Sequence, residues 1–435
     1  MPSASPGAAA PDPRCATHPR PHPRPHPAPC DRPATRPSPR ASAAFALDAS
    51  VLVTLLAASS APTPLYPRYQ EQWDLSALTV TVVFSAYALA LLLALLTTGA
   101  LSDHLGRRPV LVTALAAETL AMLLLATADG PDALIAARIL QGVATGTATS
   151  AAGAALLDLT DPTRPRRSAL ANTIAPVAGM AAGVLLSTLL TRFAPAPTVT
   201  VYLLLAAVFT GQAVAVARAP ETADRRHGAW RSLRPHLAVP PSARRTLLRA
   251  GPAVAAVWAL GGFHSSLGPA LVRAIAPHTA PAASGLPLFT LTATAALTTL
   301  ALRRTAPRTT LEVGCATVVP AAALTLYATH GAGLPALCGG AALAGAAFGA
   351  VTQGGLRLTL AALPGHGRTG TLAAYQVLCY LSMSLPAVAA GAATVHHGLT
   401  AVAHAHATST AVLAALSLPL LHRTTKETKD HDHGH

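Results

Sequence analysis

Charged residues are scarce in this chain. Asp, Glu, Lys and Arg together make up 11% of its 435 residues, whereas about 25% is usual in soluble globular domains. Together with a mean hydropathy of +0.44, this excludes an ordinary soluble protein and indicates an integral membrane protein. Aromatic residues are also few, at 4%. The net charge of +14 therefore does not indicate nucleic-acid binding, because the basic residues have almost no interleaved aromatic partners.

Lysine is nearly absent, and both lysines, Lys426 and Lys429, lie close to the C-terminus. The apolar part of the chain thus has no lysine for a phosphate-binding P-loop or a Schiff base, which argues against an ATP-driven pump carried on this chain. The five cysteines are odd in number and show no metal-ligand spacing. The loops contain no G-x-S-x-G or H-E-x-x-H motif and no paired metal ligands. We therefore expect no enzyme activity, no cofactor and no bound metal.

Long apolar runs dominate the rest of the sequence. Each is close to the roughly 17–25 residues that a membrane-spanning helix needs, and only helices satisfy their own backbone hydrogen bonds in lipid. The sequence predicts an all-α integral membrane protein with twelve transmembrane helices. The predicted spans are approximately residues 43–62, 76–98, 109–128, 133–157, 169–191, 199–217, 250–272, 285–302, 311–329, 334–356, 371–394 and 399–421.

Basic residues indicate the orientation of these spans. Of the 31 Arg and Lys residues, all but Arg68, Arg138, Arg192 and Arg273 fall on one side of the predicted topology. The positive-inside rule makes that side the cytoplasm, with both termini cytoplasmic and the protein in the inner (plasma) membrane. The expected domains are a disordered Pro/Arg-rich tail (1–42), a first six-helix bundle (43–218), a central loop (219–249), a second six-helix bundle (250–421) and a His-rich tail (422–435).

The loop after the second predicted span carries the most specific motif. Its residues run Gly99-Ala-Leu-Ser-Asp103-His-Leu-Gly106-Arg107-Arg108-Pro109. This resembles the G-x-L-x-D-x-x-G-R-[RK] loop of the major facilitator superfamily. The resemblance implies two pseudo-symmetric six-helix bundles that work by alternating access. It further implies a latch between the second and eleventh helices in the outward-open state, formed by Gly99, Asp103, Gly106, Arg107 and Arg108 and completed by Asp158 or its neighbour Asp161.

The fourth predicted span contains a second match, Arg138-x-x-Gln141-Gly142, which resembles the R-x-x-Q-G pattern of cavity-lining helices in the same superfamily. Gly142 and Gly146 also form a G-x-x-x-G step that lets two helices approach closely. An arginine at this depth costs about 2.5–3.5 kcal/mol on insertion scales. We therefore expect Arg138 to have a buried partner or to face a cavity.

A third match lies on the fifth predicted span, where Ala175-Pro176 is followed by Gly179 and Gly183. It resembles the G-P-x-x-G-x-x-x-G element of drug:proton antiporters, with Ala175 in place of the first glycine. Proline removes a backbone hydrogen bond and bends a helix, and the glycines allow close packing. Because uptake symporters usually lack the element, this resemblance favours export.

Two acidic residues lie well inside the first six predicted spans and are candidates for proton coupling. Asp48 is on the first span, which lines the cavity in the superfamily, and Glu118 is on the third, about 15 Å past Arg108 at 1.5 Å per residue. A carboxylate in a membrane interior is rare and marks a proton or substrate path. We rank Asp48 first and Glu118 second, with Arg138 near enough to modulate either.

The second half offers candidates for a substrate pocket among its few aromatic and polar residues. These candidates are Trp258, His264, Gln353, Tyr375, Gln376 and Tyr380. A histidine group near the twelfth span, made of His396, His397, His404 and His406, has spacing that fits no tight metal site.

The sequence therefore favours a secondary transporter that exports a small amphipathic compound in exchange for protons. The expected partners are that compound, protons and the lipid bilayer, without nucleic acid, and the expected state is a monomer. A metabolite or sugar uptake permease of the same superfamily is the main alternative, and a polytopic membrane enzyme is a remote one.

Overall fold

Twelve long helices account for most of the computed structural model, which describes residues 39–160, 166–223, 227–233, 239–279, 281–363 and 368–432. The expected disorder of residues 1–42 falls almost entirely outside these residues. The long helices are α1 (Pro39–Ser60), α3 (Ala77–Thr98), α5 (Arg107–Ala126), α6 (Pro131–Asp158), α7 (Arg166–Phe193), α8 (Pro197–Arg218), α10 (Pro241–Ser266), α12 (Leu286–Ala301), α13 (Pro307–Tyr327), α14 (Gly333–Ala361), α15 (Arg368–His397) and α16 (Leu399–Asp432).

Short helices connect several of the long ones. They are η1 (Thr63–Leu65), α2 (Tyr66–Trp73), α4 (Ser102–Leu105), α9 (Ala229–Ser232), α11 (Gly268–Ile275), η2 (Pro281–Gly285), η3 (Leu302–Arg304) and η4 (Ala328–Ala332). Local sequence explains where many helices begin. Pro131, Pro197 and Pro307 occupy first-turn positions, where the missing N–H costs no hydrogen bond. The Ser76 hydroxyl accepts the backbone N–H of Thr79 at 3.0 Å and so caps α3.

Every predicted span corresponds to one of the long helices, but several ends differ. Helix α10 begins at Pro241, inside the predicted central loop 219–249, and α16 continues to Asp432, through most of the predicted tail. By length and hydropathy, the described residues contain ten candidate membrane spans. One of these, Pro307–Ala361, includes both α13 and α14, whereas α6 is too polar to qualify because it carries Arg138, Gln141 and many Thr and Gly residues.

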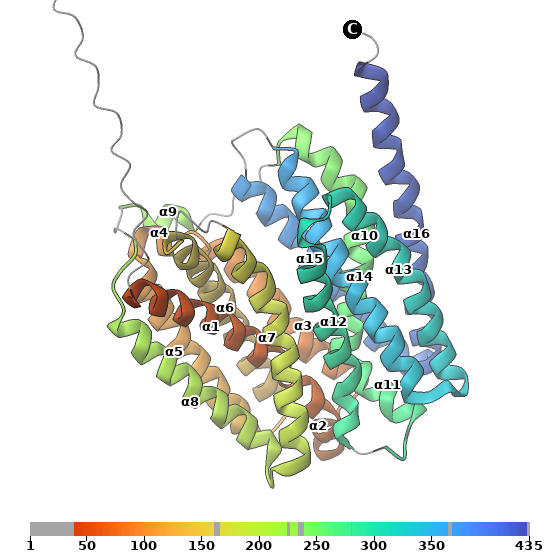
Figure 1. Ribbon diagram of the computed structural model, residues 1–435. Helices are drawn as coiled ribbons and strands as arrows, with labels where there is room; N and C mark the ends of the chain where they lie inside the picture. Colours follow the sequence, from red (N-terminus) through yellow and green to blue (C-terminus); the bar gives the residue numbers. More distant parts are fainter. Residues whose placement is uncertain are drawn as a thin grey trace, which may run out of the picture. The chain divides into compact units, whose positions relative to one another are not determined.

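The long helices pack in two groups (Figure 1). Helices α1, α3, α5, α6, α7 and α8 contact one another and form the first half; α10, α12, α13, α14, α15 and α16 form the second half. Each half has its own hydrophobic core. The main contacts between the halves are α3 with α15 and α7 with α12. The pairs that join the halves are thus the second with the eleventh long helix and the fifth with the eighth.

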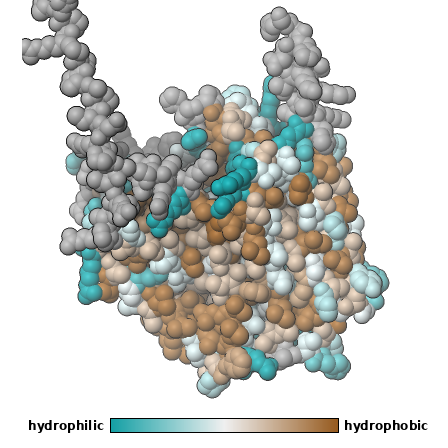
Figure 2. Space-filling view, in the orientation of Figure 1, coloured by the Kyte–Doolittle hydropathy of each residue, from teal (hydrophilic) through white to brown (hydrophobic). Residues whose placement is uncertain are grey.

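Large apolar side chains cover the outside of the helices. Leu93, Leu297, Leu385 and Leu416 are each more than half exposed, which would be unfavourable in water over so wide a surface and is expected in lipid. Figure 2 shows hydrophobic side chains over the middle of the visible face and hydrophilic ones gathered toward its edges. The surface pattern therefore agrees with a multi-pass membrane protein.

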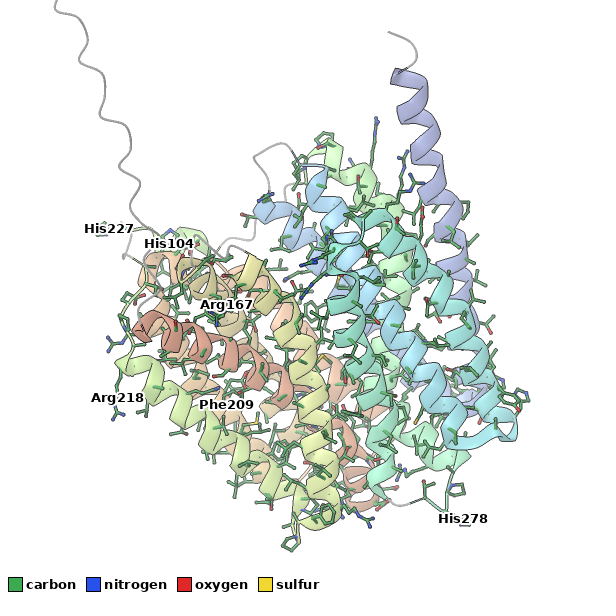
Figure 3. The ribbon with its side chains drawn as sticks, viewed as in Figure 1. His104, Arg167, Phe209, Arg218, His227 and His278 are labelled. Carbon is green, nitrogen blue, oxygen red and sulfur yellow. The ribbon has the colours of Figure 1, made fainter. Side chains whose placement is uncertain are left out.

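The two ends of the helices differ in their connections. We call the end with α4, α9 and the start of α10 the loop end. Figure 3 labels His104 and His227 there, and His278 at the other end, which we call the opposite end. At the opposite end the halves are tied together: the Thr63 hydroxyl donates to the Ser265 carbonyl at 3.0 Å, and Arg273 pairs with Glu71 at 3.0 Å. These contacts close the opposite end across the two halves.

Candidate functional site

The predicted latch residues form a charged network at the loop end. Helix α4 ends at Leu105, the next residue is Gly106, whose φ of +97° favours glycine, and α5 starts with Arg107. The Arg107 side chain pairs with Asp103 and with Asp158, the latter at 3.1 Å, and donates to the Ser102 hydroxyl at 2.7 Å. All of these residues belong to the first half. The motif indicated an i, i+4 pair of Asp103 and Arg107 with a further acid nearby. The structure places Asp103 and Asp158 around the Arg107 guanidinium group.

Other latch candidates are less involved. The Arg108 side chain is exposed. Gly99 lies near α6: a Cβ added there would make an ordinary contact of 3.6 Å with the Ser150 hydroxyl, so the approach of α3 to α6 does not depend on this glycine. Asp161, the alternative to Asp158, lies outside the described residues.

Sequence reasoning missed Glu221, which joins this network from the segment after α8. Its carboxylate accepts the backbone N–H groups of Arg107 at 2.8 Å and Arg108 at 3.2 Å. These amides belong to the first turn of α5. A negative charge at the start of a helix is stabilised by the unpaired N–H donors and by the helix dipole. The acid itself is visible in the sequence, but its pairing with a helix start more than a hundred residues earlier has no sequence signal. Glu221 ties the inter-half segment to the motif loop.

A buried arginine lies deep in the first half. Arg138 of α6 is fully buried, and its Nη1 donates to the Gln141 side-chain oxygen at 2.5 Å and the Ser59 carbonyl of α1 at 3.3 Å. Its guanidinium carbon lies 4.1 Å from the centre of the Tyr87 ring of α3, a cation–π distance. Its Nε and Nη2 atoms have no hydrogen-bond partner in the described part of the chain. Arg138 thus has the partners that its depth requires and keeps two donor nitrogens without partners among the described residues.

Glu118 of α5 is equally buried and contacts the same face of α6. One of its carboxylate oxygens accepts a hydrogen bond from the Thr145 hydroxyl, and the other has no hydrogen-bond partner within the described residues. Thr145 follows Arg138 by two turns of α6, about 10 Å along the helix axis. Glu118 is therefore bound two turns along α6 from Arg138, and the two form no direct ion pair in the residues that the structure describes.

Asp48 of α1 is buried, at 7% exposure, but lies apart from this cluster. It precedes Ser59, which contacts Arg138, by about 16 Å along the helix axis. No hydrogen bond or ion pair to Asp48 is present among the residues described here. The acid that the sequence ranked first, Asp48, and the one ranked second, Glu118, thus have different surroundings, and Glu118 is the one that contacts the helix of the buried arginine.

Glycines at the predicted positions bring helices into backbone contact. Cβ atoms added at Gly142 and Gly146 would overlap the α3 backbone, and Cβ atoms at Gly179 and Gly183 would overlap the α1 backbone at Val53 and Ala57. Pro176 lies within α7, about one turn before Gly179 and two turns before Gly183. The fourth-span motif therefore packs α6 on α3, and the fifth-span element packs α7 on α1.

Three of the predicted pocket residues meet in the second half. Trp258 of α10 contacts Tyr380 of α15 edge-on, with ring centres 5.3 Å apart, and donates to the Thr352 hydroxyl of α14 at 3.2 Å. The Tyr375 hydroxyl donates to the Thr352 carbonyl at 2.8 Å. Phe348, which the sequence did not single out, packs against Trp258 with the rings tilted and their centres 5.2 Å apart. These residues form an aromatic cluster next to the α3–α15 contact.

Other predicted pocket residues lie elsewhere. His264 is buried with Phe263 near His406, and Gln353 donates to the Thr299 carbonyl of α12. Gln376 is partly buried on α15. Among the other histidines, His404 stacks on His330 at 5.2 Å. No group of three His, Cys, Asp or Glu side chains in the described ranges is arranged to hold a metal ion.

The buried charges and the aromatic cluster are adjacent across the two halves. Tyr87, which covers Arg138, forms a small core with Ala88 and Leu91 of α3, and Tyr380 and Met383 of α15 pack against it. Charged and aromatic groups of the two halves thus meet in the middle of the α3–α15 contact. A protein with two helical halves, an apolar outer surface and a polar cluster between them has the construction of a membrane transporter.

Comparison with known proteins identifies the family. The sequence profile of the Major Facilitator Superfamily matches residues 49–385, and the chain belongs to this superfamily of secondary transporters. It is thus a multi-pass membrane transporter and not an enzyme. A shorter match, 39% identical over 109 residues, is to the tetracycline resistance protein, class C, of Escherichia coli; it spans 24% of this chain and 27% of that relative.

Solved transporter structures share the fold at low sequence identity. A bacterial homologue of the human lysosomal transporter Spinster, in an inward-facing and unoccupied conformation, has a TM-score of 0.71 at 13% identity, covering 89% of this chain and 98% of its own. The human organic anion transporter MFSD10 gives 0.63 at 20% identity, covering 88% and 100%. The nucleoside transporter NupG gives 0.65 at 13% identity, covering 87% and 98%.

Proposed function

We propose that this transporter exports a small amphipathic compound in exchange for protons, by alternating access. The observation that carries the proposal is the position of the buried Glu118–Thr145 and Arg138–Tyr87 contacts. They lie against the α3–α15 contact, where Tyr87 meets Tyr380 and its neighbour Trp258. A proton-binding group placed beside the boundary between the halves can respond when that boundary opens.

Glu118 is the carboxylate that we assign to the proton. A charged carboxylate is expensive in a membrane interior, so binding a proton when the site is closed and releasing it when water enters is favourable. One Glu118 oxygen is held by Thr145, and the other is available. Arg138 is positioned to stabilise the charged form after release. Asp48 ranks second, because its distance along α1 separates it from these groups.

The direction of transport is inferred from the fifth-span element. Gly179 and Gly183 pack α7 closely on α1, as expected if the sequence Pro176 to Gly183 acts as the element of drug:proton antiporters that it resembles. The partial likeness to a tetracycline resistance protein supports an amphipathic, drug-like substrate. The aromatic cluster around Trp258 supplies flat apolar surfaces and hydroxyl groups suited to such a compound.

Orientation and conformational control complete the proposal. We place the loop end and both termini in the cytoplasm and the helices in the plasma membrane, because the basic residues gather at the loop end. Residues 43–218 and 250–421 would then act as the two moving bundles, joined by 219–249. The Asp103, Arg107 and Asp158 network would latch the loop end when the opposite end opens. We propose that a single chain is the functional unit.

The test uses everted membrane vesicles from cells that express the protein. With an imposed inward-acid pH gradient, we expect uptake of one or more compounds from a panel of tetracyclines and other amphipathic drugs, abolished by an ionophore that collapses the gradient. Vesicles carrying Glu118→Gln provide the matched control at equal expression. Accumulation that is insensitive to the ionophore, or movement of sugars and nucleosides in the opposite direction only, would contradict the proposal.

A further inference from the structure

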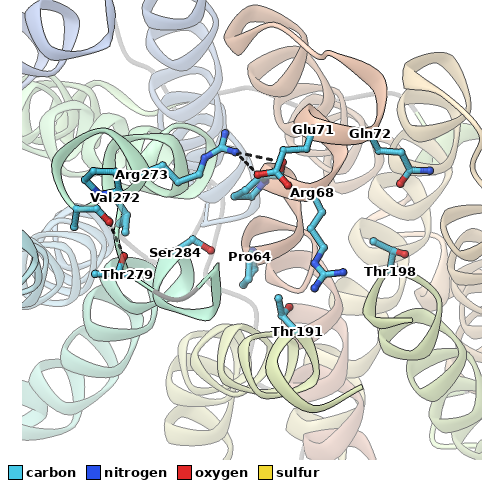
Figure 4. A pocket seen from close by; sticks show the side chains of 13 residues that line it. Pro64, Arg68, Glu71, Gln72, Thr191, Thr198, Val272, Arg273, Thr279 and Ser284 are labelled. Atoms are coloured by element: carbon cyan, nitrogen blue, oxygen red, sulfur yellow. Dashed lines mark hydrogen bonds and ion pairs between the residues drawn. The ribbon is translucent and has the colours of Figure 1, made fainter. Parts of the chain in front are cut away.

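A cavity at the opposite end has no part in the function proposed above. Its volume is about 510 Å³, and it lies between the halves, with walls from η1, α2, α7 and α8 on one side and α11 and η2 on the other (Figure 4). This volume is within the roughly 300–1,000 Å³ of small-molecule sites. None of the residues that the sequence assigned to coupling, latch or substrate pocket lines it. The cavity therefore needs its own explanation.

Two arginines line this cavity, and only one of them is engaged. Arg273 is held by the carboxylate of Glu71 at 3.0 Å and the side-chain oxygen of Gln70 at 2.7 Å. Arg68 has no hydrogen bond or ion pair within the described residues, and Figure 4 shows its side chain directed toward Thr191 of α7. Since Arg273 and Glu71 neutralise each other, the cavity keeps one uncompensated positive charge.

The other walls combine apolar surfaces with hydroxyl groups. Pro64, Pro67 and Val272 present apolar surfaces, whereas Thr191 and Thr198 present hydroxyls near Arg68. Proline rings are rigid and lose little side-chain entropy when a ligand covers them. This distribution fits a ligand with one anionic end and a flat apolar body.

Basic residues are rare at the opposite end, so the presence of two of them in one cavity is informative. The sequence-based topology leaves only Arg68, Arg192 and Arg273 in the connections at the opposite end, out of 31 basic residues, and two of these three line the same cavity.

We propose that this cavity is a binding site for a small organic anion, a carboxylate or sulfonate with an aromatic body. Arg68 and the hydroxyl of Thr198 hold the anionic group, since the Thr191 hydroxyl donates to the Ser187 carbonyl at 2.7 Å, and Pro64, Pro67 and Val272 hold the body. Because the walls belong to both halves, they separate when the opposite end opens. A bound anion therefore favours the conformation with this end closed, in proportion to its preference for that state.

The first test measures binding to the purified full chain in an uncharged detergent. Equilibrium dialysis compares 2-naphthoate with 2-naphthamide, which has nearly the same shape without the charge, against a protein-free detergent blank. We expect 2-naphthoate to bind at least ~10-fold more tightly than 2-naphthamide, because a hydrogen bond to a charged group contributes about this much to affinity. Arg68→Gln should remove this preference. Arg192→Gln, at the same end but outside the cavity and facing Phe193, should keep it.

A second test locates the site without changing its charge. In a background without native cysteines, Thr279→Cys places a thiol on the cavity wall, and Thr127→Cys places one at the same end on the exposed end of α5. We expect 2-naphthoate to slow labelling of Thr279→Cys by a membrane-impermeant maleimide and to leave Thr127→Cys unchanged. Equal binding of both probes, an unchanged preference in folded Arg68→Gln, or equal labelling with and without naphthoate would each overturn the proposal. If Arg68→Gln does not elute as a single species, the labelling result decides.

Discussion

The contact of α7 with α1 gives a sharp test of the fifth-span element. At Gly183, an added Cβ would lie 2.6 Å from the carbonyl carbon of Ala57 and would also overlap its carbonyl oxygen. Contacts below 3.0 Å are essentially never seen for real Cβ atoms. The overlapping atoms belong to the Ala57 backbone, which cannot rotate away as a side chain could. Gly183→Ala must therefore increase the separation between α7 and α1. We therefore expect Gly183→Ala to destabilise the first half.

The magnitude follows from a comparison with a glycine that has no such neighbour. Gly211 of α8 has nothing within 4 Å of an added Cβ, so Gly211→Ala changes only helix propensity, by up to ~1 kcal/mol in favour of alanine. Gly183→Ala gains the same propensity but suffers the overlap, and overpacking typically costs about 1–3 kcal/mol. The difference in stability between the two variants should therefore be about 1–3 kcal/mol.

Thermal unfolding in detergent, followed by the loss of helical circular dichroism, measures this difference. We expect the Tm of Gly183→Ala to fall at least ~2 °C below that of Gly211→Ala. Size-exclusion profiles at equal detergent confirm that both variants are folded before heating. Equal Tm values for the two variants would show that α7 does not depend on the glycine contact, and the argument for a closely packed element would fail.

Further predictions concern coupling, the loop end and topology. Glu118→Gln should still exchange substrate across vesicle membranes but lose uphill export. In the unmodified protein, one proton moving down ~150 mV supplies about 3.5 kcal/mol, which sustains a substrate concentration ratio of a few hundredfold. Unchanged pH-driven accumulation in Glu118→Gln would refute this role, and Asp48→Asn serves as the comparison. Glu221→Gln should weaken the cap on α5 by about 0.3–1 kcal/mol and speed proteolysis of the segment after α8, and an identical cleavage rate would count against the cap. In intact cells, an impermeant maleimide should label Ala332→Cys but not Ser232→Cys, and the reverse pattern would invert the proposed topology.

Much of the fold follows from sequence because it depends on local composition. Apolar length predicted all twelve long helices, including α6, whose polar residues lower its hydropathy. The ends were less predictable: Pro241 begins α10 well before the apolar run starts, because a helix can extend into water once its core segment is anchored.

The candidate site was predictable only where partners are close in the chain. The spacing of Asp103 and Arg107 is one helical turn, and their pairing follows from it. Arg138 was identified from its cost in a membrane, but Tyr87 and Ser59 as its partners depend on how three helices pack. Such contacts between distant segments leave no pattern in a single sequence, and the cavity at Arg68, built from six separate elements, leaves none either.

Tyr87 has two neighbours that belong to different halves, since one side of its ring is near the Arg138 guanidinium and Tyr380 packs against its small core. When the halves part along α3 and α15, the ring loses Tyr380, and water reaches the ring that shields a cation with two unsatisfied donors. On the proposed mechanism, the hydration of Arg138 would then change with the stage of the transport cycle. Its field at Glu118 would weaken as water screens it and strengthen as the halves close again. A single tyrosine would thus make the electrostatics of the first half depend on the position of the second.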